Sequence, residues 1–79
     1  MDNHDIKLSD LPIGKRYKIK KMFLQGLIRR RMLDLGLIDG TVVESLQKSP
    51  SGDPVAYLIR GAVIALRTEV AAMILVETL

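Results

Sequence analysis

The sequence predicts a small, mostly β barrel with one inserted α-helix and one short helical turn. The chain has 79 residues, which is enough for one small domain with a single core. Five short stretches are rich in β-branched and apolar residues and are separated by Gly, Pro and Asp, as expected for strands joined by tight turns. One longer stretch has the three-to-four-residue apolar spacing of a helix.

The N-terminal part of the chain is expected to lead into the first strand. Residues 1–7 are polar and are predicted to form a flexible tail. Residues 8–14 carry Pro and Gly near their end, which indicates a turn. The folded domain is therefore expected to span residues 8–79.

The first predicted strand covers residues 16–23 and has one irregularity. Strict alternation places Lys21 on the same face as the apolar Tyr17 and Ile19, and places Met22 on the opposite, basic face. A lysine on the face that should be buried interrupts an otherwise clear strand pattern.

The helix is predicted to begin at Gly26 and to run through residue 35. Ile28, Met32 and Leu35 fall at i, i+4 and i+7, which is a single apolar stripe expected to pack inward on the barrel. Adjacent residues lie about 100° apart on a helix, so the three arginines at 29–31 are expected to fan outward.

The rest of the chain reads as four strands and one short helical turn. Gly36 fits the position that ends the helix, where a left-handed backbone suits glycine. Thr68 is a predicted N-cap for a single helical turn through about residue 72. The remaining elements are a turn at 39–40, strands over 41–47, 55–60, 62–66 and 74–77, and a loop over 49–54.

Charge is unevenly distributed along the chain. The formal net charge is +3, but residues 15–31 alone carry +8 and hold no acid. Such a stretch is either a surface for an acidic or phosphate-rich partner, or a solvated face that keeps a small apolar protein soluble.

Composition excludes most site chemistry. Without cysteine there is no disulfide framework and no thiolate metal site. The lone histidine is His4, where Asp2 and Asp5 complete at most a weak divalent-ion site. The longest apolar run is seven residues, against about 20 for a membrane span. We therefore expect a cytoplasmic, non-enzymatic module with no cofactor and no membrane span.

Several short motifs occur in a specific order. The block Arg29 to Leu37 reads RRRMLDLGL, and GDP follows at 52–54. This order and spacing closely resembles the ferrous iron transport protein A (FeoA) family from about Leu8 to Glu77. The further matching pieces are Leu8-Ser9-Asp10-Leu11, Gly14, Gly40-Thr41, Arg60-Gly61 and Leu66-Arg67.

The resemblance implies an SH3-like β-barrel that serves as a cytosolic accessory of the membrane ferrous iron transporter FeoB. It implies protein–protein contact with the cytosolic G-protein region of that transporter. The partner-binding candidates match family positions on or next to the helix and the loops. They are Arg29, Arg30, Arg31, Met32, Asp53, Pro54 and Arg67.

Other functions stay open from the sequence. The basic stretch 15–31 is a candidate for phosphate contact with nucleic acid, although three aromatic residues provide no stacking platform, so no stable nucleic-acid complex is expected. A weak transition-metal-sensing domain, like that of iron-dependent repressors, is a second alternative implied by the resemblance. Small barrels with exposed edge strands also pair readily, so a homo-oligomer is possible, although the sequence does not determine the oligomeric state.

Overall fold

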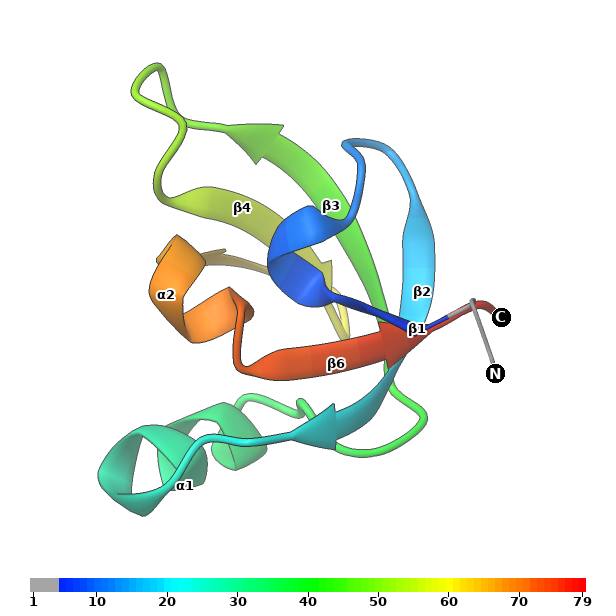
Figure 1. Cartoon of the computed structure of the whole chain (residues 1–79), viewed down its shortest axis with the longest axis vertical. Coiled ribbons are helices and arrows are strands. Elements are labelled where there is room, and N and C mark those ends of the chain that lie inside the picture. The colour runs from blue at the N-terminus through cyan, green and yellow to red at the C-terminus, as the bar shows by residue number, and fades with distance from the viewer. Residues whose placement is uncertain (1–4) are drawn as a thin grey trace.

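The computed structural model describes residues 5–79 and consists mainly of one antiparallel sheet (Figure 1). The order of its six strands is β1-β6-β2-β3-β4-β5. The mostly β class with two short helices is therefore confirmed, with six strands in place of five. The elements are β1 (Asp5–Lys7), the 3-10 helix η1 (Leu8–Asp10), β2 (Arg16–Met22), α1 (Gly26–Asp34), β3 (Val42–Lys48), β4 (Val55–Ile59), β5 (Ala62–Leu66), α2 (Thr68–Ala71) and β6 (Ile74–Glu77).

The additional strand lies in the segment that was expected to be a tail. β1 pairs with β6, with Ile6 opposite Val76, and Lys20 Nζ forms an ion pair with Asp5 Oδ2. Ile6 packs against the core. A flexible tail is therefore wrong for residues 5–7, because sheet pairing and the burial of Ile6 outweigh the polar composition. Residues 1–4 lie outside the described residues.

A β-bulge resolves the irregular lysine in β2. The register against β6 shifts between Ile19 and Lys21, so Lys20 is the extra residue. Beyond the bulge Met22 lies opposite the buried Ile74. Met22 is half-buried against the core and Lys21 is exposed, which reverses the faces that strict alternation assigned to them.

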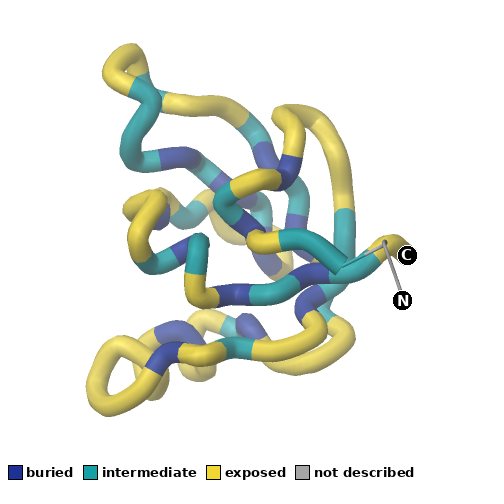
Figure 2. Tube along the Cα trace, viewed as in Figure 1, coloured by how far each residue is buried: buried dark blue, intermediate teal, exposed yellow. Residues whose placement is uncertain are grey.

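The core lies between the curved sheet, η1 and α2 (Figure 2). Tyr57 is its largest fully buried side chain, and its hydroxyl donates a hydrogen bond to the carbonyl oxygen of Leu8 at 3.4 Å. Burial, with a smaller effect from the negative charge of Asp53, raises the pKa of Tyr57 to about 12. The phenol therefore remains a neutral donor that ties η1 to β4.

α1 ends in a Schellman motif that buries only part of the helix. The Leu37 N–H donates to the Met32 carbonyl at 3.1 Å, and the Gly36 N–H donates to the Leu33 carbonyl at 3.0 Å. Met32 and Leu37 are both buried, at 3% and 0% exposure. Their contact anchors the C-terminal end of α1 to the sheet.

Gly36 also receives the side chain of Arg60 from the β4–β5 turn. The φ angle of Gly36 is +99°, and a Cβ atom built there would overlap Arg60 Cδ. Glycine is therefore favoured at residue 36 chiefly for its backbone conformation, and a larger residue would also have to displace the exposed Arg60 side chain. The contact joins the end of α1 to the β4–β5 hairpin, although the two are far apart in sequence.

α2 is capped from another loop and not by its own first residues. Asp53 Oδ1 accepts hydrogen bonds from the Thr68 N–H at 2.8 Å and from Thr68 Oγ1 at 3.1 Å. Thr68 is the first helical residue and Arg67 the N-cap, so Thr68 as N-cap is wrong. The carboxylate of Asp53 performs the role that a capping side chain performs in other helices.

We expect Gly36→Ala to destabilise the fold more than Gly40→Ala. Both glycines have positive φ, but nothing lies within 4 Å of a Cβ at Gly40. Gly40→Ala should therefore show only the backbone cost of about 1–2 kcal/mol, and Gly36→Ala should exceed it through the clash with Arg60. Urea unfolding of both variants measures the difference. Adding Arg60→Ala to Gly36→Ala should recover part of the lost free energy of unfolding. If the effects of the two substitutions on that free energy simply add, the contact between the two residues is contradicted.

We expect Asp53→Ala to lower the free energy of unfolding by about 1–2 kcal/mol, because two hydrogen bonds to the start of α2 are lost. Asp53→Asn keeps an accepting oxygen and should retain most of the stability. Chemical denaturation of the two variants provides the test. Equal stability of Asp53→Ala and the wild type would show that the cap contributes nothing.

Candidate functional site

The three adjacent arginines of α1 are all exposed, as their spacing predicts. Arg29 differs from the other two, because its Nη1 donates a hydrogen bond to the Met22 carbonyl at 3.3 Å. This bond ties the helix to the end of β2. Arg30 and Arg31 remain as the arginines of α1 best placed to contact a partner.

The apolar stripe of α1 packs inward at one residue only. Met32 is the buried residue of the helix, whereas Ile28 and Leu35 are each 37% exposed and Leu27 is 86% exposed. The inward stripe expected from periodicity is therefore only partly present. α1 lies at one end of the molecule (Figure 1), where the sheet offers too little surface to cover a whole helix face.

The uncovered part of the stripe lines a groove between α1 and β5, which we name the α1–β5 groove. Its volume is about 340 Å³. Arg31 lines it from the helix and Arg67 from the start of α2. The remaining lining residues are apolar: Ile28, Met32, Leu35, Ile64, Ala65, Leu66 and Val70. An apolar groove that carries two arginines suits a ligand with both apolar and acidic groups.

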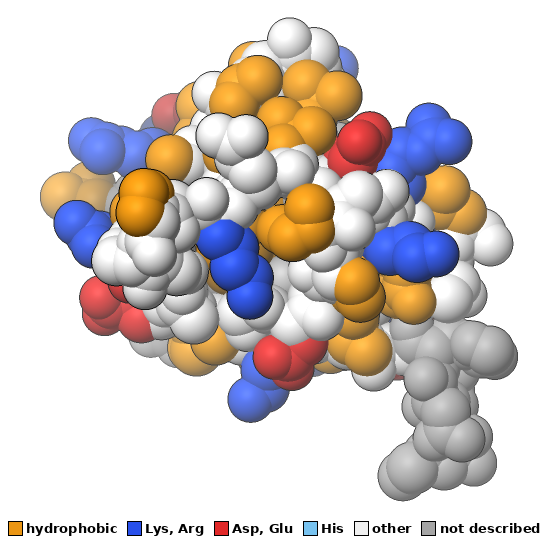
Figure 3. Space-filling view, turned by 90° about the horizontal axis from the view of Figure 1, so that it is seen from above, with side chains coloured by type: hydrophobic (Ala, Val, Ile, Leu, Met, Phe, Trp, Pro, Cys, Tyr) orange, Lys and Arg blue, Asp and Glu red, His pale blue; other side chains and the backbone are white. Residues whose placement is uncertain are grey.

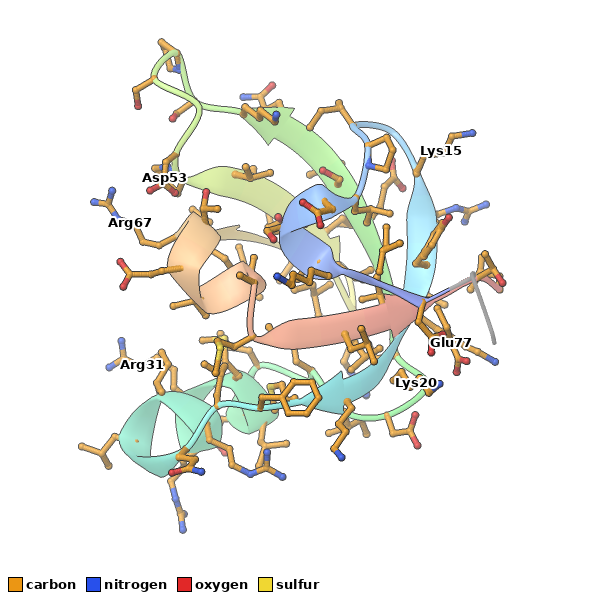
Figure 4. All side chains as sticks on the ribbon, in the orientation of Figure 1. Lys15, Lys20, Arg31, Asp53, Arg67 and Glu77 are labelled. Carbon is orange, nitrogen blue, oxygen red and sulfur yellow. The ribbon has the colours of Figure 1, made fainter. Side chains whose placement is uncertain are left out.

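The candidates from the loop lie at the end of this groove. Arg67 Nη1 lies 3.8 Å from Asp53 Oδ2, and Figure 4 shows Arg67 and Arg31 on the same side of the molecule. Pro54 is half-buried, and its carbonyl oxygen accepts a hydrogen bond from the Ser49 N–H at 3.1 Å. Asp53 and Pro54 therefore shape the loop and α2, while Arg67 lines the groove and keeps its guanidinium near Asp53.

The structure separates the basic stretch 15–31 into different surfaces. Lys15 lies on the side opposite Arg31 (Figure 4). Lys20, Lys21 and Arg29 line a second, smaller groove between β2 and α1 of about 260 Å³. From above, basic and apolar side chains alternate over the surface (Figure 3). The basic side chains of the stretch therefore do not all share one face of the molecule.

The wall of the α1–β5 groove opposite the helix has no functional signal in the sequence. Ile64 and Ala65 of β5 and Val70 of α2 form part of it, and nothing in the local sequence shows that they lie near α1. The available structural signal is the composition of residues 62–66, AVIAL, which has no charged or polar side chain. Edge strands usually carry charges, so an uncharged strand at the end of a sheet is informative once the strand order is known.

The described residues hold no assembled metal site. Within residues 5–79, no three His, Cys, Asp or Glu side chains come close enough to share a metal ion. His4 lies outside that range. In the same part of the chain, no helix is long and apolar enough to cross a membrane.

Comparison with known proteins assigns these features to a family. The model of the FeoA domain matches residues 6–78. A Porphyromonas gingivalis protein, the Fe(2+) transport protein A/Fe(2+) transporter FeoB fusion protein, is 36% identical over 72 residues. That match covers 91% of this chain and only 8% of the fusion protein, so the chain corresponds to a small part of that relative.

Solved structures share the fold. The solution structure of FeoA from Chlorobium tepidum superposes with a TM-score of 0.88 at 34% identity, covering 94% of this chain and 70% of that one. Stenotrophomonas maltophilia FeoA, crystallised with zinc and described as a prokaryotic SH3 domain protein, gives a TM-score of 0.82 at 26% identity, covering 91% and 89%. With the match over residues 6–78, the sheet and the placement of α1, these similarities show that the chain belongs to the FeoA domain family.

Proposed function

We propose that this protein is a cytoplasmic, non-enzymatic accessory of ferrous iron transport. In this proposal it acts by contact with the cytosolic G-protein region of a FeoB-type transporter. The contact surface comprises Arg30 and Arg31 of α1 together with Arg67. Arg29, Met32, Asp53 and Pro54 support that surface by holding α1, α2 and the adjoining loop in place.

The observation that carries the proposal is the fusion relative. A segment 36% identical to this chain forms one polypeptide with a FeoB transporter in Porphyromonas gingivalis. Covalent fusion keeps two domains at high effective concentration, which favours even a weak contact between them. A separate chain of the same family must obtain that proximity through affinity, and so it requires a docking surface.

The exposed face of α1 supports the proposal of such a surface. α1 presents two exposed arginines beside two exposed apolar residues, Ile28 at 37% and Leu27 at 86% exposure. Exposed apolar groups next to arginine are typical of protein-binding patches. The grooves next to α1 are open and shallow, and their residues suggest no bond-making chemistry. Binding therefore accounts for these features better than catalysis does.

We expect Arg30→Ala/Arg31→Ala to weaken binding to the transporter's G domain by about fivefold to tenfold, because two cationic contacts are lost. The measurement is an NMR titration of the isotope-labelled protein with the purified G domain, loaded with GDP or with a GTP analogue, at two salt concentrations. Amide shifts should concentrate on residues 27–37 and around Arg67.

Lys15→Ala/Lys48→Ala is the matched control, because it removes the same charge from exposed residues away from α1. It should leave the affinity within about twofold if the contact is local. Equal losses for both double variants would indicate nonspecific attraction to positive charge. Absence of shifts with the G domain and with the full-length transporter in lipid nanodiscs would contradict the proposed partner.

A further inference from the structure

β5 forms one edge of the sheet and has no strand on its outer side. The strand order ends at β5, which pairs with β4 alone within residues 5–79. Its five residues are Ala62 to Leu66, and Val63 is 66% exposed. An exposed edge without charge can accept another strand through its backbone.

The β4–β5 turn determines which backbone groups are available. Arg60 and Gly61 both have positive φ, 51° and 83°, as in a type I′ turn. The residues that flank such a turn, Ile59 and Ala62, form a hydrogen-bonded pair, and these pairs alternate along the ladder. Val63 and Ala65 therefore direct their N–H and C=O groups away from β4.

The α1–β5 groove lies beside the second half of β5. Ile64, Ala65 and Leu66 line it and Val63 does not. Because neighbouring strand residues point to opposite faces, three consecutive lining residues indicate that the groove reaches the edge of the strand there. The opposite wall is formed by α1 residues 28, 31, 32 and 35, which share one helix face. A groove between a strand edge and a helix face is the geometry in which an extended peptide adds to a sheet.

Charge identifies the type of segment that fits. Arg31 and Arg67 line the groove and no acidic side chain does. Asp53, near Arg67 at 3.8 Å, is partly engaged by Thr68. Pairing of β5 with a second copy of itself would bring no acid to the groove, because residues 62–66 contain none, and it would bring more arginines together. A foreign segment with acidic residues is therefore favoured.

We propose that β5 accepts an extended segment of a partner protein as a seventh strand. The segment's backbone pairs with Val63 and Ala65. Apolar side chains of the segment fill the groove against Ile28 and Leu35, and an acidic side chain lies between Arg31 and Arg67. For the identity of the partner this inference rests on the proposed function, whereas the docking mode rests on the groove alone.

The first test uses a defined probe. A capped peptide of alternating valine with aspartate and glutamate is titrated into the isotope-labelled full chain and followed by NMR. We expect saturable downfield shifts of the Val63 and Ala65 amide protons, together with slower solvent exchange of both. The same peptide with N-methyl groups on its pairing amides should bind at least about tenfold more weakly. A version with lysine in place of the acids should also lose affinity.

Two substitutions locate the interaction on the protein. Ala65→Pro removes an outward N–H that the ladder with β4 does not use, so the fold should tolerate it, while the β5 shifts disappear. If that variant does not fold, Arg31→Glu is the second test. This substitution should weaken binding of the acidic peptide by about fivefold and should strengthen binding of the lysine peptide, because it reverses the charge preference of the groove.

The outcomes separate this inference from the proposed function. Binding of the probe at Val63 and Ala65 supports strand addition, whether or not the transporter's G domain binds. Binding of the G domain with no response at β5, and none to the probe up to millimolar concentration, overturns strand addition and leaves the proposed function in place. Shifts at β5 that grow with protein concentration alone would show that a second copy occupies the edge, which also overturns the proposal.

Discussion

The position of α1 depends mainly on a small anchor at its C-terminal end, and the proposed binding surface depends on that position. Met32 is the buried residue of the helix, and Leu37 packs beside it through the Schellman motif. Arg60 then lies over Gly36, where any larger residue would displace it. Because these contacts hold only the C-terminal part of α1, the rest of its apolar stripe stays uncovered. The anchor thus holds the helix next to β5 without closing the space between them.

A second link positions the other end of the α1–β5 groove. Asp53 in the β3–β4 loop holds the start of α2 by accepting two hydrogen bonds from Thr68. The same carboxylate lies near Arg67, so the loop, the helix start and one groove arginine form a connected unit. A substitution in the loop should therefore alter the groove even though the substituted residue does not line it. The family motif GDP has a structural meaning here, which is separate from any direct contact with a partner.

Membership in the FeoA family and the shape of the surface make complementary contributions to the functional argument. The fusion relative supports the proposed partner, and the groove supports the proposed mode of docking. In that proposal, the arginines would provide selectivity through charge and the apolar groove would provide affinity through burial. The larger share is expected from burial, because exposed ion pairs contribute little.

The local features of this protein can be predicted from its residues alone. Periodicity predicts α1 and five strands, Gly36 marks the helix end, and the arginine spacing predicts exposed side chains. The remaining features depend on contacts between residues far apart in the chain, which form only in the folded protein. These contacts make Asp5–Lys7 a strand, insert the bulge at Lys20, and replace the expected Thr68 cap with Asp53. They also bring α1 beside the edge of β5. Turn and helix preferences act over a few residues, whereas pairing, capping from a loop and groove formation require the folded chain.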